Sequence, residues 1–288
     1  PPTTLLSSAA SDVYKRQVPT LFINDVQKGI LGICTDAGYD IVVHPCEFGS
    51  EDLVDDVQRF INRSKVDGVI MLPPVSDVTE LVAALDRSRT PYVRFASEMS
   101  AESWRLVVTN YVPAVSDMTN HLVNFGHKRI GFISGPRDNV SSQKRQQAFV
   151  EALARHGLEL DQAYVAEGAF TYESGVKCAG KILESEPRPT AIFAANDEMA
   201  FGVMNVANSL GIKVPDDLSV VGFDGTKFAT FVIPSLSTIR RPSADMARLA
   251  AQKLLALVDE GPDAARAFES MVSPQFVPRQ STGPAPRD

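Results

Sequence analysis

Short runs rich in valine and isoleucine alternate with amphipathic stretches along most of this chain. Residues 69–72 (VIML), 130–134 (IGFIS) and 191–195 (AIFAA) are such runs, and a stretch with apolar residues at helical spacing follows each of them. Strands with few polar residues are buried on both faces, as in parallel sheets that are covered by helices. The alternation therefore predicts an α/β fold with doubly wound parallel sheets.

The chain carries more of these units than one sheet comfortably holds, and 288 residues suit about two domains of ~150 residues each. We therefore expect two similar domains. Residues 1–17 (PPTTLLSSAASDVYKRQ) show neither strand alternation nor helical periodicity, and their apolar run is too short for a signal peptide. We interpret this segment as a leader outside the fold. Near the other end, we expect residues 272–277 to return as a final strand.

The charge balance limits the partners that this chain can have by itself. It has 28 Lys and Arg against 35 Asp and Glu, a formal net charge of −7. DNA affinity comes mostly from Lys and Arg that neutralise phosphates, so we do not expect this chain alone to grip nucleic acid. No apolar run approaches the ~18 residues that span a bilayer, so no membrane partner is expected either.

The cysteines and histidines predict neither a disulfide framework nor a metal site. Cys34, Cys46 and Cys178 are scattered without a CxxC pair, and the four histidines have no HExxH spacing. We interpret the cysteines as reduced thiols of a cytoplasmic protein, and we expect no metal and no cofactor. The sequence also lacks the GxSxG and GxxxxGK[ST] motifs, so we expect no catalytic residues and no enzyme activity.

Polar residues stand at the carboxyl ends of several predicted strands, where open parallel sheets bind ligands. Asn110 follows the run that begins at Leu106, Asn196 follows residues 191–195, and Asp224 follows residues 218–223. Arg145, near the start of the next predicted helix, adds a guanidinium group. Carboxylate, amide and guanidinium groups together suit a polyhydroxylated ligand, because sugar hydroxyls both donate and accept hydrogen bonds.

Each of these residues also has a purely structural interpretation. Asn196 could cap the following helix, a role compatible with ligand binding. Asp224 precedes Gly225 and could be an ordinary turn residue. Arg145 could lie on the surface. Phe170, in the loop GAFTYES, could stack on a sugar ring or belong to the core.

Four ordered stretches of the chain carry recognisable motifs: GHKRIGFISGP (126–136), SSQKRQQAFVEAL (141–153), AIFAANDEMAFGVMNVANSLGIKVPDDLSVVGFDG (191–225) and PSLSTIRRPSADMARLAAQKLL (234–255). With these motifs, roughly residues 22–282 resemble the lactose-repressor (LacI/GalR) family of transcriptional regulators. The resemblance implies the periplasmic-binding-protein-like fold, with two lobes around a cleft. It places an N-terminal lobe at residues 18–112 plus 242–270 and a C-terminal lobe at residues 113–241 plus 271–288.

The resemblance also implies roles for individual residues. Arg145, Asn196 and Asp224 stand at positions that contact the effector in that family, and Ala148 replaces the Gly that usually follows this Arg. The resemblance also implies that Phe170 is the aromatic residue that contacts the effector. Arg241 occupies a position where Gln is frequent, and Asn110 with Tyr111 replaces an Asp pair of many members. We expect ligand binding by all six of the residues Arg145, Asn196, Asp224, Phe170, Asn110 and Arg241.

The family resemblance favours a regulator that senses a small effector, usually a sugar, and controls DNA binding. The helix-turn-helix headpiece of the family is absent from this sequence, so operator DNA is expected as a partner only through that headpiece. We also expect a homodimer with contacts from helices near residues 25–37 and 77–86. The alternative is a soluble, periplasmic-type sugar-binding receptor of a transport system, which would need an export signal.

Overall fold

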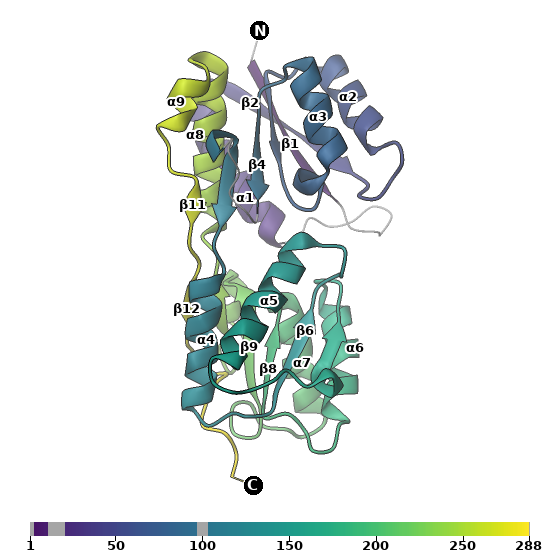
Figure 1. Ribbon diagram of the computed structural model, residues 1–288, viewed down its shortest axis with the longest axis vertical. Coiled ribbons are helices and arrows are strands. Elements are labelled where there is room, and N and C mark those ends of the chain that lie inside the picture. Colours follow the sequence, from purple (N-terminus) through teal and green to yellow (C-terminus); the bar gives the residue numbers. More distant parts are fainter. Residues whose placement is uncertain (1–2, 11–20, 97–102, 288) are drawn as a thin grey trace. The chain divides into compact units, whose positions relative to one another are not determined.

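The computed structural model describes residues 3–10, 21–96 and 103–287, and the chain forms two compact units (Figure 1). The chain crosses between the units after residues 110, 241 and 272, where the sequence led us to expect crossings after 112, 241 and 270. Each unit is built from an open sheet with helices on both faces. Unit 1 comprises Pro1–Asn110 and Pro242–Val272, and unit 2 comprises Tyr111–Arg241 and Ser273–Asp288.

The sheet of unit 1 has the strand order β11-β5-β4-β3-β1-β2, and every pairing in it is parallel. This agrees with the predicted α/β class, because parallel neighbours need a crossover connection between them. The strands are β1 (Thr3–Ala10), β2 (Tyr39–Cys46), β3 (Gly68–Met71), β4 (Tyr92–Ala96), β5 (Leu106–Thr109) and β11 (Met271–Val272).

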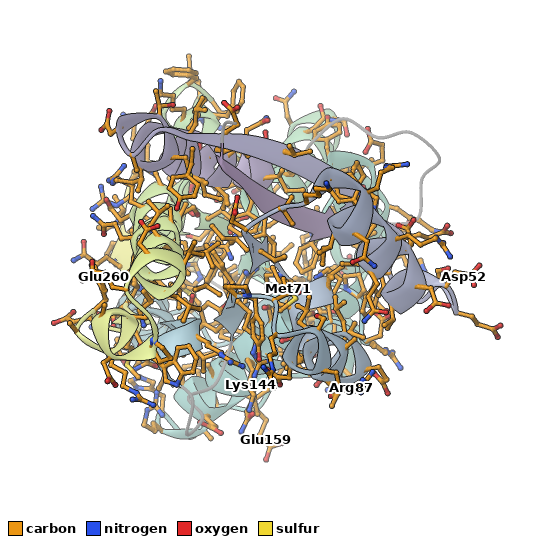
Figure 2. All side chains as sticks on the ribbon, turned by 90° about the horizontal axis from the view of Figure 1, so that it is seen from above. Asp52, Met71, Arg87, Lys144, Glu159 and Glu260 are labelled. Atoms are coloured by element: carbon orange, nitrogen blue, oxygen red, sulfur yellow. The ribbon has the colours of Figure 1, made fainter. Side chains whose placement is uncertain are left out.

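Helices cover both faces of this sheet, because successive residues of one strand pack against different pairs of helices. In β3, Ile70 packs in a cluster with residues of α1 (Leu21–Asp36) and α8 (Ser243–Asp259). Its neighbours Val69 and Met71 pack with α2 (Leu53–Ser64) and α3 (Thr79–Ser88) on the opposite face. Figure 2 shows the labelled Met71 in the interior of unit 1 and the exposed Asp52 and Glu260 at its rim. A short helix, α9 (Pro262–Arg266), follows α8, and one-turn 3₁₀ helices lie at Val75–Asp77 and Ser103–Arg105.

The interpretation of residues 1–17 as a leader outside the fold is wrong for its first part. Thr3–Ala10 forms β1 and lies inside the sheet, between β2 and β3; Leu5 pairs with Ile41 on one side and with Gly68 on the other. An interior parallel strand is held by main-chain hydrogen bonds on both sides and needs no alternation, so its pattern gave no signal. Residues 11–17 lie outside the described part of the chain.

The sheet of unit 2 has the order β12-β10-β9-β8-β6-β7, parallel except for the β10–β12 pair. Helices α4 (Val112–Asn124) and α5 (Val140–Ala154) pack together, and α6 (Tyr172–Leu183) packs with α7 (Asp197–Ser209) (Figure 1). The strands are β6 (Ile130–Ser134), β7 (Val165–Glu167), β8 (Ala191–Ala194), β9 (Ser219–Asp224), β10 (Ser237–Arg240) and β12 (Gln275–Val277), with 3₁₀ helices at Gln162–Tyr164 and Lys227–Thr230.

The single final strand expected over residues 272–277 is also wrong. The structure has two short strands there: β11 pairs in parallel with β5 in unit 1, and β12 pairs antiparallel with β10 in unit 2. Pro274 stands between them. Proline has no N–H to donate to a ladder, and this breaks the run into two pieces.

Two glycines allow α6 and α7 to pack closely. A Cβ atom at Gly175 would lie 2.4 Å from the carbonyl oxygen of Met199, and one at Gly202 would lie 2.6 Å from the backbone nitrogen of Val176. The two helix backbones therefore touch where larger side chains would hold them apart. In the described part of the chain, no helix is both long enough and apolar enough to cross a membrane.

Candidate functional site

Five of the six predicted ligand-binding residues lie in unit 2, on segments that meet the carboxyl edge of its sheet. Asp224 ends β9, Asn196 follows β8, and Arg241 follows β10. These strands are parallel neighbours, so their carboxyl ends lie at the same edge. Arg145 comes from the second turn of α5, and Phe170 from the loop before α6.

Arg145 is not a surface residue, because only 4% of it is exposed. Its guanidinium carbon lies 3.9 Å from the ring centroid of Phe223 and 5.4 Å from that of Tyr111. One terminal nitrogen donates to the main-chain oxygen of Ala195, whereas the buried Nε has no hydrogen-bond partner. Burial lowers the pKa of Arg145, but an arginine stays protonated in proteins. The site therefore contains a buried cation among aromatic rings.

Tyr111 belongs to this cluster, although we did not predict a ligand-binding role for it from the sequence. It is buried and packs edge-on against Phe223, with ring centroids 5.5 Å apart. Burial alone would raise the pKa of the phenol. The charges of Arg145 and Arg241, together with hydrogen bonds to Ser141 and Arg145, outweigh burial and lower it. The signal available in the sequence was only its position next to Asn110.

Asp224 and Arg241 form an ion pair within unit 2. A terminal nitrogen of Arg241 lies 2.9 Å from Oδ1 of Asp224, and the Arg241 backbone N–H donates to the Asp224 carbonyl oxygen at 3.1 Å. Both side chains are largely buried. Asp224 has a φ of +110°, a backbone conformation that favours glycine. Asp224 thus combines an unusual backbone conformation with a buried ionic partner.

Asn196 has the capping role that we considered for it. Its side-chain oxygen accepts a hydrogen bond from the backbone N–H of Met199 at 2.9 Å, at the start of α7. Its amide nitrogen donates to the carbonyl oxygen of Phe170 at 2.7 Å. A side-chain amide nitrogen carries two N–H groups, and the bond to Phe170 uses one of them. The second N–H can donate to a ligand.

Phe170 lies between the two interpretations that the sequence left open. It is partly buried against the unit 2 core, and its ring centroid is 5.7 Å from the guanidinium carbon of Arg145. A Cβ atom at Gly135 would come within 2.0 Å of the ring, so the ring rests directly on that backbone. The φ of Phe170 is +59°, which is unusual for an aromatic residue. The loop thus holds this ring beside the buried cation.

Asp197 is a buried carboxyl group that the sequence analysis did not select. It accepts hydrogen bonds from the backbone N–H of Thr226 at 2.7 Å and from the hydroxyl of Thr238 at 2.6 Å. Burial, and then the charge of Asp224, raise the pKa of Asp197 to about 7. Its position directly after Asn196 was visible in the sequence, but nothing in the sequence showed that it points inward.

Asn110 lies in unit 1, at the end of β5. It is half-buried, and its backbone N–H donates to the carbonyl oxygen of Val272 in the neighbouring strand at 3.2 Å. The structure does not group it with the five residues of unit 2, so its role in ligand binding stays a prediction.

An open hollow of about 370 Å³ lies at the opposite, amino edge of the unit 2 sheet. Its lining includes Arg129, Thr190 and Asp217, which precede β6, β8 and β9, respectively. None of the predicted ligand-binding residues lines it. Its chemistry is therefore separate from that of the candidate site.

Comparisons with known proteins agree with this architecture. A family model described as "Periplasmic binding protein-like domain" matches residues 119–282. Catabolite control protein A of Priestia megaterium is 33% identical over 82% of this chain and 71% of its own length. The HTH-type transcriptional repressor CytR of Escherichia coli K12 is 32% identical over 83% of this chain and 69% of its own length.

A solved structure shows the same fold along nearly the whole chain. The regulatory protein of the LacI family from Chloroflexus aggregans has a TM-score of 0.79 and 25% identity, covering 97% of this chain and 98% of its own. These similarities favour a transcriptional regulator over a transport receptor. The chain therefore belongs to the LacI family of transcriptional regulators, and it has the periplasmic-binding-protein-like fold of the effector-binding part of that family.

Proposed function

We propose that this chain binds a small, hydroxylated, sugar-like effector at the carboxyl edge of the unit 2 sheet. The observation that carries this proposal is the buried guanidinium of Arg145 beside the Asp224–Arg241 ion pair. The Asp224 carboxylate can accept hydrogen bonds from hydroxyl groups, and the second amide N–H of Asn196 can donate to one. The ring of Phe170 offers an apolar surface for the face of a sugar.

Effector binding would act on DNA binding through a shift between two conformations. A ligand that binds one arrangement of the protein more tightly raises the population of that arrangement. In a regulator, the two arrangements would differ in how they hold the DNA-binding headpieces. The proposal includes no catalytic step, because the site pairs Asp224 with a guanidinium rather than with a nucleophile or a second ionised carboxylate. A cytoplasmic location follows from this role.

We also propose that the protein acts as a homodimer. Helix α1, which the sequence suggested for the interface, exposes the apolar side chain of Leu31. In unit 2, the segment after β9 exposes Phe228, Phe231 (69%) and Ile233 (95%). Exposed apolar side chains that gather in one segment are typical of protein–protein contacts.

Thermal denaturation with a panel of sugars and sugar derivatives tests effector binding. A ligand at 100 times its Kd should stabilise the folded protein by ~2.7 kcal/mol. The Asp224→Ala variant should lose ~1.5–3 kcal/mol of binding free energy, because it lacks the charged acceptor. The exposed Asp216→Ala variant is the matched control and should bind like the wild type. A panel without any stabilising member, or full affinity in Asp224→Ala, would contradict the proposal.

A further inference from the structure

Two guanidinium groups and one ionised carboxylate meet at the candidate site, and only one guanidinium has an ionic partner. Arg241 pairs with Asp224. Among the described residues, no carboxylate forms an ion pair with Arg145, which instead donates to the main-chain oxygen of Ala195 and interacts with the phenol of Tyr111. Its buried Nε has no hydrogen-bond partner. The charge of Arg145 is thus left without a counterion inside unit 2.

The other charged groups near the site do not change this balance. Asp197 accepts hydrogen bonds from two threonines, and burial raises its pKa to about 7, so it does not supply a full negative charge near neutral pH. Asp224 attracts Arg145 electrostatically, but its Oδ1 is bonded to Arg241. Arg240 adds a further positive charge near Arg279. Arg145 is therefore the guanidinium beside the rings of Phe223 and Phe170 that forms no ion pair among the described residues.

This balance points to a charge on the effector. Resting on the proposed function, we propose that the effector is a sugar acid whose single carboxylate pairs with Arg145, while its hydroxyl groups bond to Asp224 and Asn196. Burying a cation without a partner costs free energy, and a planar carboxylate matches the two parallel N–H groups of a guanidinium. A phosphate monoester carries about −1.5 to −2 charges, more than one guanidinium balances.

Calorimetric titration with matched pairs of acid and uncharged sugar tests this proposal. The pairs are D-glucuronate with D-glucose, D-galacturonate with D-galactose, and D-gluconate with D-glucitol, and D-glucose 6-phosphate represents phosphorylated sugars. In at least one pair, the acid should bind about tenfold or more tightly than its uncharged partner. The 6-phosphate should bind more weakly than that acid.

Two variants test whether Arg145 and Arg241 cause the preference for the acid over the uncharged sugar. Arg145→Met removes the charge but keeps the length of the side chain, and it should abolish the preference for the acid. Arg241→Gln should reduce the ratio between the affinity for the acid and the affinity for the uncharged sugar. Without Arg241, Asp224 is free to accept hydrogen bonds from the hydroxyl groups that both members of a pair carry. Arg155→Met is the control, since Arg155 lies at the exposed end of the same helix. Without ligand, Arg145→Met should melt no lower than Arg155→Met, because it removes a buried charge that lacks a counterion.

The outcomes separate this inference from the proposed function. Equal or tighter binding of the uncharged member in every pair that binds would overturn the sugar acid and leave sugar sensing intact. If D-glucose 6-phosphate bound most tightly, the effector would be a phosphorylated sugar rather than a sugar acid. A large loss of stability in ligand-free Arg145→Met would show that the protein itself satisfies the guanidinium. If neither member of any pair bound, both the inference and the proposed function would fall.

Discussion

The carboxyl group of Asp197 gives the clearest residue-level test of the electrostatics in unit 2. It is fully buried, and its pKa is raised from 3.8 to about 7. The folded state therefore binds a proton that the unfolded state has already lost, so this group stabilises the fold at low pH and the contribution is lost as pH rises towards 7.

Asp197→Asn should remove this pH dependence. The amide can accept from the Thr226 N–H and donate to the Thr238 hydroxyl, so it fits the same place. Relative to the wild type, the variant should gain on the order of a few kcal/mol of unfolding free energy between about pH 5 and pH 8. Urea denaturation across that range measures the difference, with exposed Asp216→Asn as control. A difference that stays constant with pH would mean that Asp197 ionises normally.

At this scale, the sequence predicted residue types better than it predicted their partners. Asp224 could be selected because it stands at the end of a strand, and Arg145 because it stands near the start of the helix that follows another strand. The Asp224–Arg241 ion pair could not, because it depends on the register between β9 and β10, in which Asp224 lies opposite Arg240. That Arg145 forms no ion pair among the described residues likewise depends on packing between segments that are distant in sequence.

At the scale of the helices and strands, close packing of α6 and α7 rests on glycine. Gly175→Ala should destabilise unit 2 by ~1–3 kcal/mol, because the new methyl group would overlap the Met199 backbone. Gly180→Ala, in the same helix, meets no atom within 4 Å and should stabilise by ~0.5–1 kcal/mol. Thermal melts of both variants show whether each substitution raises or lowers the stability of the protein. If both substitutions were stabilising, the contact between the helices would be looser than described.

The helical and strand periods predicted most elements, and the exceptions have physical causes. Strand β1 (TTLLSSAA) lacks the valine and isoleucine that identify the other strands in the sequence. Strand β7 has only three residues and gives no periodic signal. The split of residues 272–277 depends on Pro274 and on where the chain passes from one unit to the other, and the second of these is a property of the fold rather than of local sequence.

At the scale of the whole molecule, the proposed homodimer can be tested through its apolar segment. Replacing Phe231 by Glu adds a charge where an apolar contact is proposed, and it should raise the dimer dissociation constant about tenfold or more. Leu210→Glu is the control, since Leu210 is comparably exposed but lies beside the hollow at the amino edge. Sedimentation equilibrium gives both constants. A wild-type protein that stays monomeric at micromolar concentration would exclude the dimer.

Hydrogen exchange, with and without the tightest ligand of the sugar panel, tests the location of effector binding most directly. Protection should appear in unit 2 at the segments that follow β6, β8 and β9, around residues 135–139, 195–197 and 225–227, and in the loop that carries Phe170. The hollow lined by residues 186–190 and 210–212 should exchange as it does without ligand. Protection confined to that hollow would contradict the proposed effector site.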